Sequence, residues 1–220
     1  RYDTYDLFMN VPEPLVPREL RFEVPERIAP DGTVLTALDE AAVVSVARAI
    51  AKTDAKAVAI SLLHGFRNPV HERRVREIVR REAPDLVLCV SSDVMPEIGE
   101  YERTSTTVCN AYVLPVFEMY LRRLTQGLRK MGIDRDLYLM LSDGGTVHES
   151  TAAAYPIRLV QSGPAGGVQA TSAVGQSAGL GDLLCFDMGG TTAKACLIEN
   201  GQPLRTTEFE VARVYRFKKG

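Results

Sequence analysis

The feature that most constrains this chain is a pair of apolar runs joined by a glycine turn. The runs are Leu183–Phe186 and Ala195–Ile198, and the segment between them reads Asp-Met-Gly-Gly-Thr-Thr-Ala-Lys. This order predicts a strand, a tight turn and a second strand. Adjacent glycines allow positive φ and let the N–H groups of the turn approach a ligand closely. The segment therefore predicts a hairpin loop that cradles phosphate.

The polar residues of this turn suit a nucleotide. Asp187 can hold a metal-bound water, and Thr191 and Thr192 can donate to phosphate oxygens. The alternative is a bulged hairpin turn without a ligand, which requires neither the carboxylate nor the hydroxyls. The sequence contains no G-x-x-x-x-G-K-[ST] and no G-x-G-x-x-G. These absences exclude a Walker loop and a dinucleotide fingerprint.

Two further glycine turns precede this one, at residues 142–145 and 162–167. Each follows an apolar run that predicts a strand, at 137–141 and 158–160. In α/β sheets, ligands gather where strands end, so three such turns predict an anion or nucleotide cleft. The candidate binding residues of the two turns are Ser142, Gly144, Gly145, Ser162, Gly163 and Gly166.

A helix is predicted from about Pro164 to Ala178. Pro164 suits its first position and Ser162 suits its cap. The free N–H groups at such a start would face whatever occupies the cleft. A helix start packed tightly on a sheet, with glycines for close approach, is the alternative.

Patterns elsewhere predict an α/β chain. Helical spacing marks 39–52, 71–82 and 101–131, and apolar runs mark strands at 57–63 and 86–90. Other predicted features are an extended proline-rich segment over 1–30, a strand over 21–24, and turns at Asp31-Gly32 and Asn200-Gly201. In the longest helix, a kink or break is expected at Pro115. One stripe of that helix carries Val108, Tyr112, Val116, Met119, Tyr120 and Leu124.

Composition narrows the class of protein. The 220 residues are 45% hydrophobic and 25% charged with a net charge of −2, which is typical of a globular chain of one or two domains. No bulk basicity indicates nucleic acid, and no apolar run is long enough for a membrane span. Four widely spaced cysteines indicate reduced thiols and a cytoplasmic protein. We place a domain boundary between residues 1–98 and 99–220, after a linker-like segment at 93–99.

Four segments in order carry a family resemblance. They are Leu63–Arg74, Glu100–Tyr112, Ser162–Val168 and Asp187–Thr192. The last segment resembles a phosphate loop of the actin, hexokinase and Hsp70 type of ATPase. Together the four resemble the A subunit of the hydantoinase, oxoprolinase and ketone carboxylase family, over most of the chain from about residue 20 onward.

The resemblance implies an actin-like ATPase (ribonuclease H-like) α/β architecture, with this chain as a fragment spanning two lobes. It implies ATP and Mg²⁺ as cofactors, and ATP activating an amide or carbonyl oxygen. Asp187 would be the catalytic and metal-binding residue. Gly189, Gly190, Thr191, Thr192 and Lys194 would bind the cofactor. The implied substrate is a small cyclic amide, with a ketone as the alternative, and the implied partner is a B-type subunit. A scaffold subunit without catalysis is a third interpretation.

Two departures from the family pattern bear on these expectations. Family members often carry an acidic residue where this chain has Lys194, and a cation can reach phosphate but cannot help to hold a metal. The family's first phosphate loop is also absent from this chain. We therefore expect the isolated chain to bind ATP weakly or not at all.

Other chemistry-bearing residues have structural interpretations. His64, His71 and Glu72 lack the H-E-x-x-H spacing of a zinc site and are interpreted as loop and helix-start residues. His148 with Ser142 and Asp143 supplies the residue types of a hydrolase triad, but G-x-S-x-G is missing. Asn110 either hydrogen-bonds within the fold or is exposed in the long helix.

Overall fold

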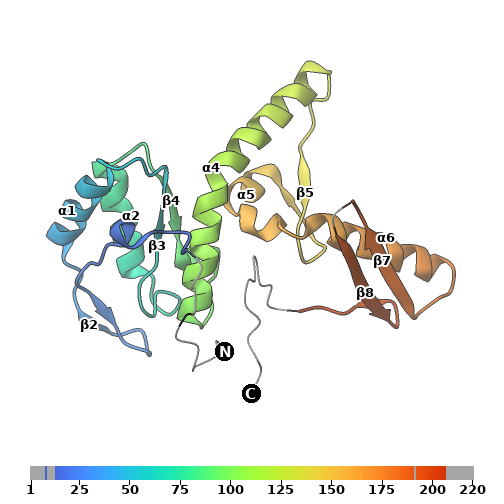
Figure 1. Cartoon of the computed structure of the whole chain (residues 1–220), viewed down its shortest axis with the longest axis horizontal. Coiled ribbons are helices and arrows are strands. Elements are labelled where there is room, and N and C mark those ends of the chain that lie inside the picture. Colours follow the sequence, from blue (N-terminus) through green and yellow to red (C-terminus); the bar gives the residue numbers. More distant parts are fainter. Residues whose placement is uncertain (1–7, 9–12, 191, 207–220) are drawn as a thin grey trace. The chain divides into compact units, whose positions relative to one another are not determined.

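The computed structural model describes Phe8 and residues 13–190 and 192–206. Its chain divides into two compact units (Figure 1). The large unit is Arg18–Gly167, and the small unit combines Arg1–Pro17 with Val168–Gly220. No helix in the described part of the chain is both long and apolar enough to cross a membrane. The boundary placed between residues 98 and 99 falls inside the large unit and stays a prediction.

A β-α-β element forms the centre of the large unit. The strands β3 (Ala57–Ile60) and β4 (Val87–Val90) pair in parallel, and α2 (Val70–Glu82) connects them. Parallel strands require a crossover of this kind, because a tight turn can join only antiparallel strands. The predicted alternation of strand, helix and strand is therefore confirmed, and with it the α/β class.

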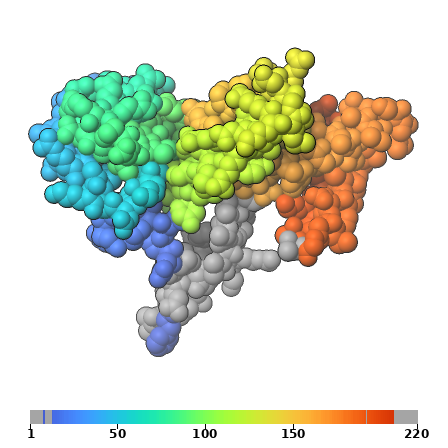
Figure 2. Space-filling model, turned by 90° about the horizontal axis from the view of Figure 1, so that it is seen from above, coloured from blue at the N-terminus to red at the C-terminus, as the bar shows by residue number. Residues whose placement is uncertain are grey.

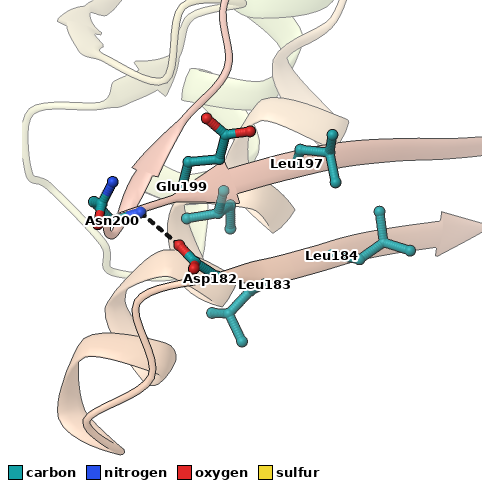
Figure 3. Close-up of a pocket in the computed structure, with 7 residues that line it drawn as sticks. Asp182, Leu183, Leu184, Leu197, Glu199 and Asn200 are labelled. Carbon is teal, nitrogen blue, oxygen red and sulfur yellow. Dashed lines mark hydrogen bonds between the residues drawn. The ribbon is translucent and has the colours of Figure 1, made fainter.

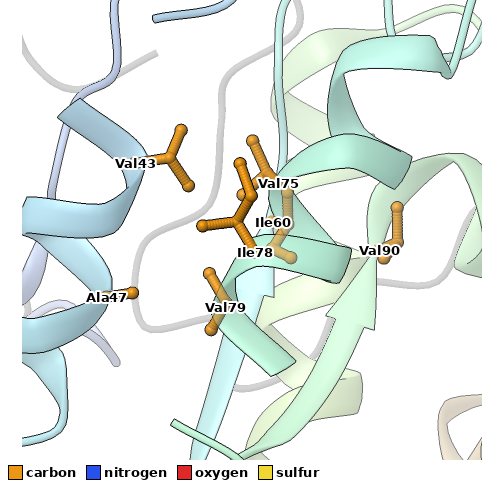
Figure 4. Packing of buried hydrophobic residues seen from close by; sticks show 7 residues of the cluster. All are labelled: Val43, Ala47, Ile60, Val75, Ile78, Val79 and Val90. Carbon is orange, nitrogen blue, oxygen red and sulfur yellow. The ribbon is translucent and has the colours of Figure 1, made fainter. Parts of the chain in front are cut away.

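Helices cover both faces of this strand pair. On one face, α1 (Glu40–Ile50) and α2 close a core over β3 and β4 (Figure 4). On the other face, Cys89 packs with residues of α4 (Glu100–Lys130). Burial on two faces explains why both strands read as nearly continuous apolar runs. The buried members of the first core are Val43, Ala47, Ile60, Val75, Ile78, Val79 and Val90.

The helix α1 starts where the sequence predicts it. Asp39 is its N-cap, and its Oδ1 accepts a hydrogen bond from the backbone N–H of Ala42 at 2.9 Å. This bond satisfies one of the amides that a helix start leaves without a partner. The helix predicted from residue 39 to 52 is therefore confirmed within two residues at either end.

The long helix α4 differs from the expectation in two ways. It runs through Pro115 without a break. The predicted stripe is largely exposed: Tyr112, Val116, Met119 and Tyr120 are all open to solvent. The space-filling view shows part of α4 in yellow-green at the surface of the large unit (Figure 2). The residues that α4 does bury are Arg103, Thr107, Asn110, Ala111, Leu114 and Leu121.

Two predicted strands are wrong. Residues 21–24 are irregular, and they follow the 3₁₀ turn η1 (Arg18–Leu20). Residues 158–160 do not form a strand, because Pro156 opens the 3₁₀ helix η2 (Pro156–Leu159). Proline fixes φ at a value that suits the first turn of a helix. The Arg158 carbonyl instead accepts a hydrogen bond from the Ser142 N–H at 2.7 Å.

Short elements complete the large unit. The hairpin of β1 (Arg27–Ile28) and β2 (Val34–Thr36) closes through Gly32 at φ 92°, as the Asp-Gly turn predicts. The remaining elements are α3 (Ser91–Val94), β5 (Tyr138–Met140), β6 (Thr146–His148) and α5 (Glu149–Ala154).

The small unit holds an antiparallel sheet in the order β7 (Leu183–Met188), β8 (Ala193–Glu199) and β9 (Gln202–Pro203). The strands β8 and β9 join through Asn200 and Gly201, at φ 50° and 75°, which confirms the predicted Asn-Gly hairpin. The helix α6 (Ser162–Ser177) passes from the large unit into the small one. Within the small unit, Thr171 donates a hydrogen bond to the Cys185 sulfur at 3.3 Å, which places α6 against one face of the sheet.

Candidate functional site

The Asp187 turn is a hairpin loop, as the sequence predicts. The strands β7 and β8 pair antiparallel up to Met188 opposite Ala193. Beyond that pair, the Gly189 N–H donates to the Thr192 carbonyl at 3.0 Å. Thr191 lies outside the described residues. The loop is therefore a tight turn at the end of a two-stranded ribbon.

The two glycines of the loop do not have the positive φ that we expected. Neither Gly189 nor Gly190 is left-handed. The hydrogen bond from Gly189 extends the strand ladder by one more pair, which agrees with an extended Gly189. A Cβ added to either glycine would meet no heavy atom of the described residues within 4 Å. Internal packing therefore does not require glycine here, and the bare backbone is open to a ligand.

Asp187 and Lys194 lie directly opposite each other across this ribbon. Both are exposed, and the described ion pairs do not join them. Among the described residues, no group of three or more His, Cys, Asp or Glu side chains could hold a metal ion. Asp187 thus offers a single carboxylate with a cation across from it. At nucleotide sites Mg²⁺ is usually held by one or two carboxylates together with phosphate oxygens and water, so Asp187 would supply one ligand and the nucleotide the others.

The turn at 142–145 is satisfied within the chain. The Gly144 N–H donates to the Leu141 carbonyl at 3.1 Å, and the Gly145 N–H donates to Asp143 Oδ1 at 2.8 Å. Gly144 is left-handed, at φ 85°. Ser142 Oγ accepts from the backbone N–H of Gln161 at 3.0 Å. Ser142 therefore fastens the turn to the start of α6.

The helix α6 begins earlier than predicted. Its first residue is Ser162, and the Ala165 N–H donates to the Gln161 carbonyl at 3.1 Å. Gln161 thus occupies the position that we expected for Ser162, and Pro164 is the third helical residue. Proline is tolerated there because the first amides of a helix have no partner within it.

The candidate residues fall into two groups. Ser142, Ser162 and their neighbouring glycines belong to the large unit, where the bond from Gln161 to Ser142 brings the turn and the helix start together. The Asp187 loop belongs to the small unit. A nucleotide-binding role for both groups stays a prediction.

A shallow pocket lies at the other end of the β7–β8 ribbon (Figure 3). Its polar edge is formed by Asp182, whose Oδ1 accepts from the Asn200 N–H at 2.9 Å. Leu184 and Leu197 form part of its apolar wall. None of the predicted binding residues lines it, and the Asp182 bond serves the β8–β9 turn.

Sequence reasoning missed a buried polar network at the carboxyl ends of β3 and β4. Glu72 is fully buried, and its carboxylate accepts from the Leu62 N–H at 2.8 Å, Ser91 Oγ at 2.5 Å and the Ser92 N–H at 3.0 Å. Arg103, 1% exposed, donates to Ser91 Oγ at 3.0 Å and to the Leu62 carbonyl at 2.9 Å. The buried charges are thereby hydrogen-bonded, as burial requires. Two of the segments that carry the family resemblance meet in this network.

The histidines have structural contacts. His64 Nδ1 lies 2.8 Å from the Ile28 carbonyl, and His71 Nδ1 lies 2.7 Å from Glu26. His148 caps α5 and lies 2.8 Å from Ser150 Oγ. Its neighbour is Ser150 and not Ser142, so the residue types that suggested a hydrolase triad do not come together.

Asn110 is buried in the middle of α4. Its Nδ2 donates to the Ala154 carbonyl at 3.2 Å, and its Oδ1 accepts from the Ile157 N–H at 3.2 Å. It also donates to the sulfur of Cys89, a free thiol whose pKa burial raises. Asn110 therefore joins α4 to α5 and η2 within the large unit.

Two family models match the chain. One, described as Hydantoinase/oxoprolinase, covers residues 103–217, and the other, described as the Hydantoinase/oxoprolinase N-terminal region, covers residues 1–83. A protein of Methanocaldococcus jannaschii is 41% identical over 94% of this chain and 30% of its own length.

Two relatives have known roles. The caprolactamase subunit alpha of Pseudomonas jessenii is 36% identical over 90% of this chain and 28% of its own length. The acetone carboxylase beta subunit of Xanthobacter autotrophicus is 34% identical over 91% of this chain and 28% of its own length. The chain therefore spans less than a third of the length of these relatives.

Solved structures agree with the sequence matches. The ATP-dependent caprolactamase of Pseudomonas jessenii superposes with a TM-score of 0.79 at 35% identity, over 90% of this chain and 29% of that one. The nucleotide-free structure of acetone carboxylase, from work on ATP-dependent acetone carboxylation, superposes with a TM-score of 0.77 at 34% identity. The match covers 86% of this chain and 27% of that one. With a family model over more than half of its residues and relatives of the same fold, the chain belongs to the hydantoinase/oxoprolinase family.

Proposed function

We propose that this chain is the nucleotide-contacting part of an ATP-dependent enzyme that opens a small cyclic amide. The observation that carries the proposal is the open hairpin end, where bare backbone at Gly189 and Gly190 stands beside an exposed Asp187. The likeness to an ATP-dependent caprolactamase supports both the nucleotide and the substrate class.

In the proposed reaction, the γ-phosphoryl group of ATP passes to the carbonyl oxygen of the cyclic amide and ADP leaves. Water then attacks the activated carbonyl carbon, the ring opens and phosphate departs. Such transfers depend on positioning and charge stabilisation more than on covalent work by the protein. The backbone of Gly189 and Gly190 and the hydroxyls of Thr191 and Thr192 would hold the phosphates. Asp187 would orient the attacking group or the nucleotide.

A ketone carboxylase is the second candidate, because acetone carboxylase matches this chain almost as well as caprolactamase does. In that reaction the activated carbonyl belongs to bicarbonate or the ketone, and the phosphate loop keeps the same role. The residues of the loop do not separate the two substrate classes. In either case the relatives are subunits, so we propose a further subunit of the B type as the partner.

The test uses the full polypeptide that carries this chain, together with its partner subunit. ATP hydrolysis is measured with caprolactam, hydantoins, 5-oxoproline or acetone, with and without bicarbonate. Replacing Thr191 and Thr192 together by Val is expected to lower kcat roughly a hundredfold, as loss of preorganised donors does elsewhere. Thr36→Val, on exposed β2, is the matched control.

The outcomes separate the candidates. Stimulation by a cyclic amide without bicarbonate supports the hydrolase, whereas a requirement for bicarbonate supports the carboxylase. Turnover that is undiminished in the double Val variant would contradict the phosphate loop and favour a scaffold subunit.

A further inference from the structure

Two of the four cysteines of the chain lie directly opposite each other in the small unit. They are Cys185 on β7 and Cys196 on β8, and both are free thiols. Because the Gly189 N–H donates to the Thr192 carbonyl opposite it, these two residues form a hydrogen-bonded pair of the ladder. Such pairs recur at every second residue, so Cys185 and Cys196 also form one. The Cα atoms of a pair of this kind are about 5.5 Å apart.

This separation suits a disulfide. Disulfides usually join Cα atoms that are about 4.4–6.8 Å apart. Side chains that are opposite each other in antiparallel strands project on the same face, with Cβ atoms roughly 4.5–5.5 Å apart. A disulfide brings its Cβ atoms to about 3.5–4.5 Å, so the two strands need to approach locally by roughly 1 Å. Strain of this kind makes a disulfide easier to reduce, and the bond is therefore expected to form reversibly.

The two thiols differ in access to solvent. Cys185 is 8% exposed, and its sulfur accepts a hydrogen bond from Thr171 Oγ1 of α6 at 3.3 Å. Cys196 is only partly buried, and its sulfur lies 3.7 Å from the Leu204 carbonyl, on the side of β8 away from β7. A change of rotamer about the Cα–Cβ bond of Cys196 turns its sulfur toward Cys185. Cys196 is thus the thiol that a small oxidant reaches first.

We propose that Cys185 and Cys196 are a thiol modification site, which closes into a cross-strand disulfide when a small disulfide such as oxidised glutathione is present. The Cys196 thiolate attacks one sulfur of the oxidant, whose S–S bond breaks, and the first glutathione leaves as a thiolate. The Cys185 thiolate then attacks the Cys196 sulfur, and the second glutathione leaves. The two protons lost by the cysteines pass to the released glutathione thiolates, so the cysteine pair loses two electrons and the oxidant gains them.

The disulfide lies close to the hairpin loop. The next pair on the same face toward the loop is Asp187 with Lys194. A covalent bond between Cys185 and Cys196 therefore fixes the two strands that carry the loop. The proposal requires only the pairing of β7 with β8, so it goes beyond the proposed function and does not depend on ATP binding.

The experiment incubates the full polypeptide that carries this chain in glutathione buffers of increasing oxidised fraction. Remaining thiols are alkylated, and disulfide-linked peptides are identified by mass spectrometry. The expected product is a pair of peptides joined through Cys185 and Cys196, which dithiothreitol separates. Cys89 and Cys109 in the large unit are the matched controls, because burial raises the pKa of both thiols. Since the thiolate is the reactive form, both controls are expected to stay reduced.

Two variants test the order of attack. Cys185→Ser is expected to retain one glutathione on Cys196, whereas Cys196→Ser should leave the buried Cys185 largely unmodified. If Cys185 in the second variant takes up glutathione as readily as Cys196 does in the first, the assigned order of attack is overturned.

The deciding measurement uses the unchanged protein, so a variant that fails to fold does not obscure it. If the most oxidised buffer gives no linkage between Cys185 and Cys196, the proposal is overturned. The same holds if either cysteine is linked mainly to Cys89 or Cys109.

Discussion

At the scale of single residues, buried polar side chains join elements of the large unit beside its apolar core. Glu72 and Arg103 are 0% and 1% exposed, and Ser91 lies between them. In the sequence, Glu72 stands in a helix crowded with arginine and glutamate, which is typical of a solvated face. A single sequence does not distinguish the one glutamate that turns inward. The tertiary contacts that satisfy its carboxylate come from residues 10 and 19 positions along the chain.

The tight approach of Gly65 to Glu72 gives a test of this network. A Cβ at Gly65 would lie 2.6 Å from the Glu72 carboxylate, which three hydrogen bonds hold in place. Gly65→Ala is therefore expected to lower the free energy of unfolding by about 1–3 kcal/mol. Gly127→Ala is the control, because a Cβ there meets nothing within 4 Å and alanine favours a helix interior by about 0.5–1 kcal/mol. Equal urea unfolding midpoints for the two variants, at equal slopes, would contradict the prediction.

At the scale of elements, local signals predicted most of the fold. The Asp39 cap, the apolar runs of β3 and β4 and the Asn-Gly turn each specify their own element, and each is confirmed. The failures are of two kinds. Residues 21–24 have strand-like alternation but no partner strand in the described part of the chain, and residues 158–160 follow a proline that opens a 3₁₀ helix.

The candidate site was predictable in part for the same reason. The hairpin of β7 and β8 is local, so its turn follows from the sequence. The φ value of Gly189 was not predictable, because it follows from one extra ladder bond beyond the predicted strand. The link from Ser142 to Gln161 joins residues 19 positions apart, and no periodicity signals it.

Paired charges connect α1 and α2 and make their packing sensitive to acid. Arg74 donates to both carboxylate oxygens of Glu40 at 2.8 Å, and Arg48 donates to Glu82 at 3.0 Å. Hydrogen bonds from Arg74 hold the pKa of Glu40 below its ordinary value of 4.5, and those from Arg81 and then Arg48 do the same for Glu82. A carboxyl group whose pKa is lower in the folded protein stabilises the folded state at pH values above its unfolded-state pKa. This stabilisation is lost as the pH falls through the folded-state pKa.

Stability is therefore expected to fall as the pH drops below 4.5, and Glu40→Gln with Glu82→Gln should make that fall shallower. Unfolding by urea at a series of pH values from 6 to about 3 measures it. Glu97→Gln, at an exposed position without a described ion pair, is the control. An equal slope in the double variant and in the control would show that these pairs contribute nothing. Added salt should reduce the difference, because exposed pairs are screened.

At the scale of the whole molecule, each unit leaves an apolar surface open. On the outer face of β7 and β8, Leu184, Phe186, Met188 and Leu197 are 51–72% exposed. In the large unit, the α4 stripe described above is open as well. Exposed apolar patches of this kind are uncommon in proteins that act alone. They agree with the finding that the chain spans under a third of the length of its relatives.

The exposed apolar face of β7 and β8 predicts binding of the dye ANS, whose fluorescence reports accessible apolar surface. Phe186→Asp places a charge in the middle of the β7–β8 face and is expected to lower dye fluorescence without lowering the unfolding midpoint, because Phe186 is 61% exposed and little packing is lost. Ile98→Asp, an isolated residue that is 82% exposed, should leave the fluorescence unchanged. If Val116→Asp abolishes dye binding and Phe186→Asp does not, then the α4 stripe is the dominant apolar surface. A midpoint lowered by Phe186→Asp would show instead that this face is packed in solution, since a side chain already in water loses nothing when it becomes charged.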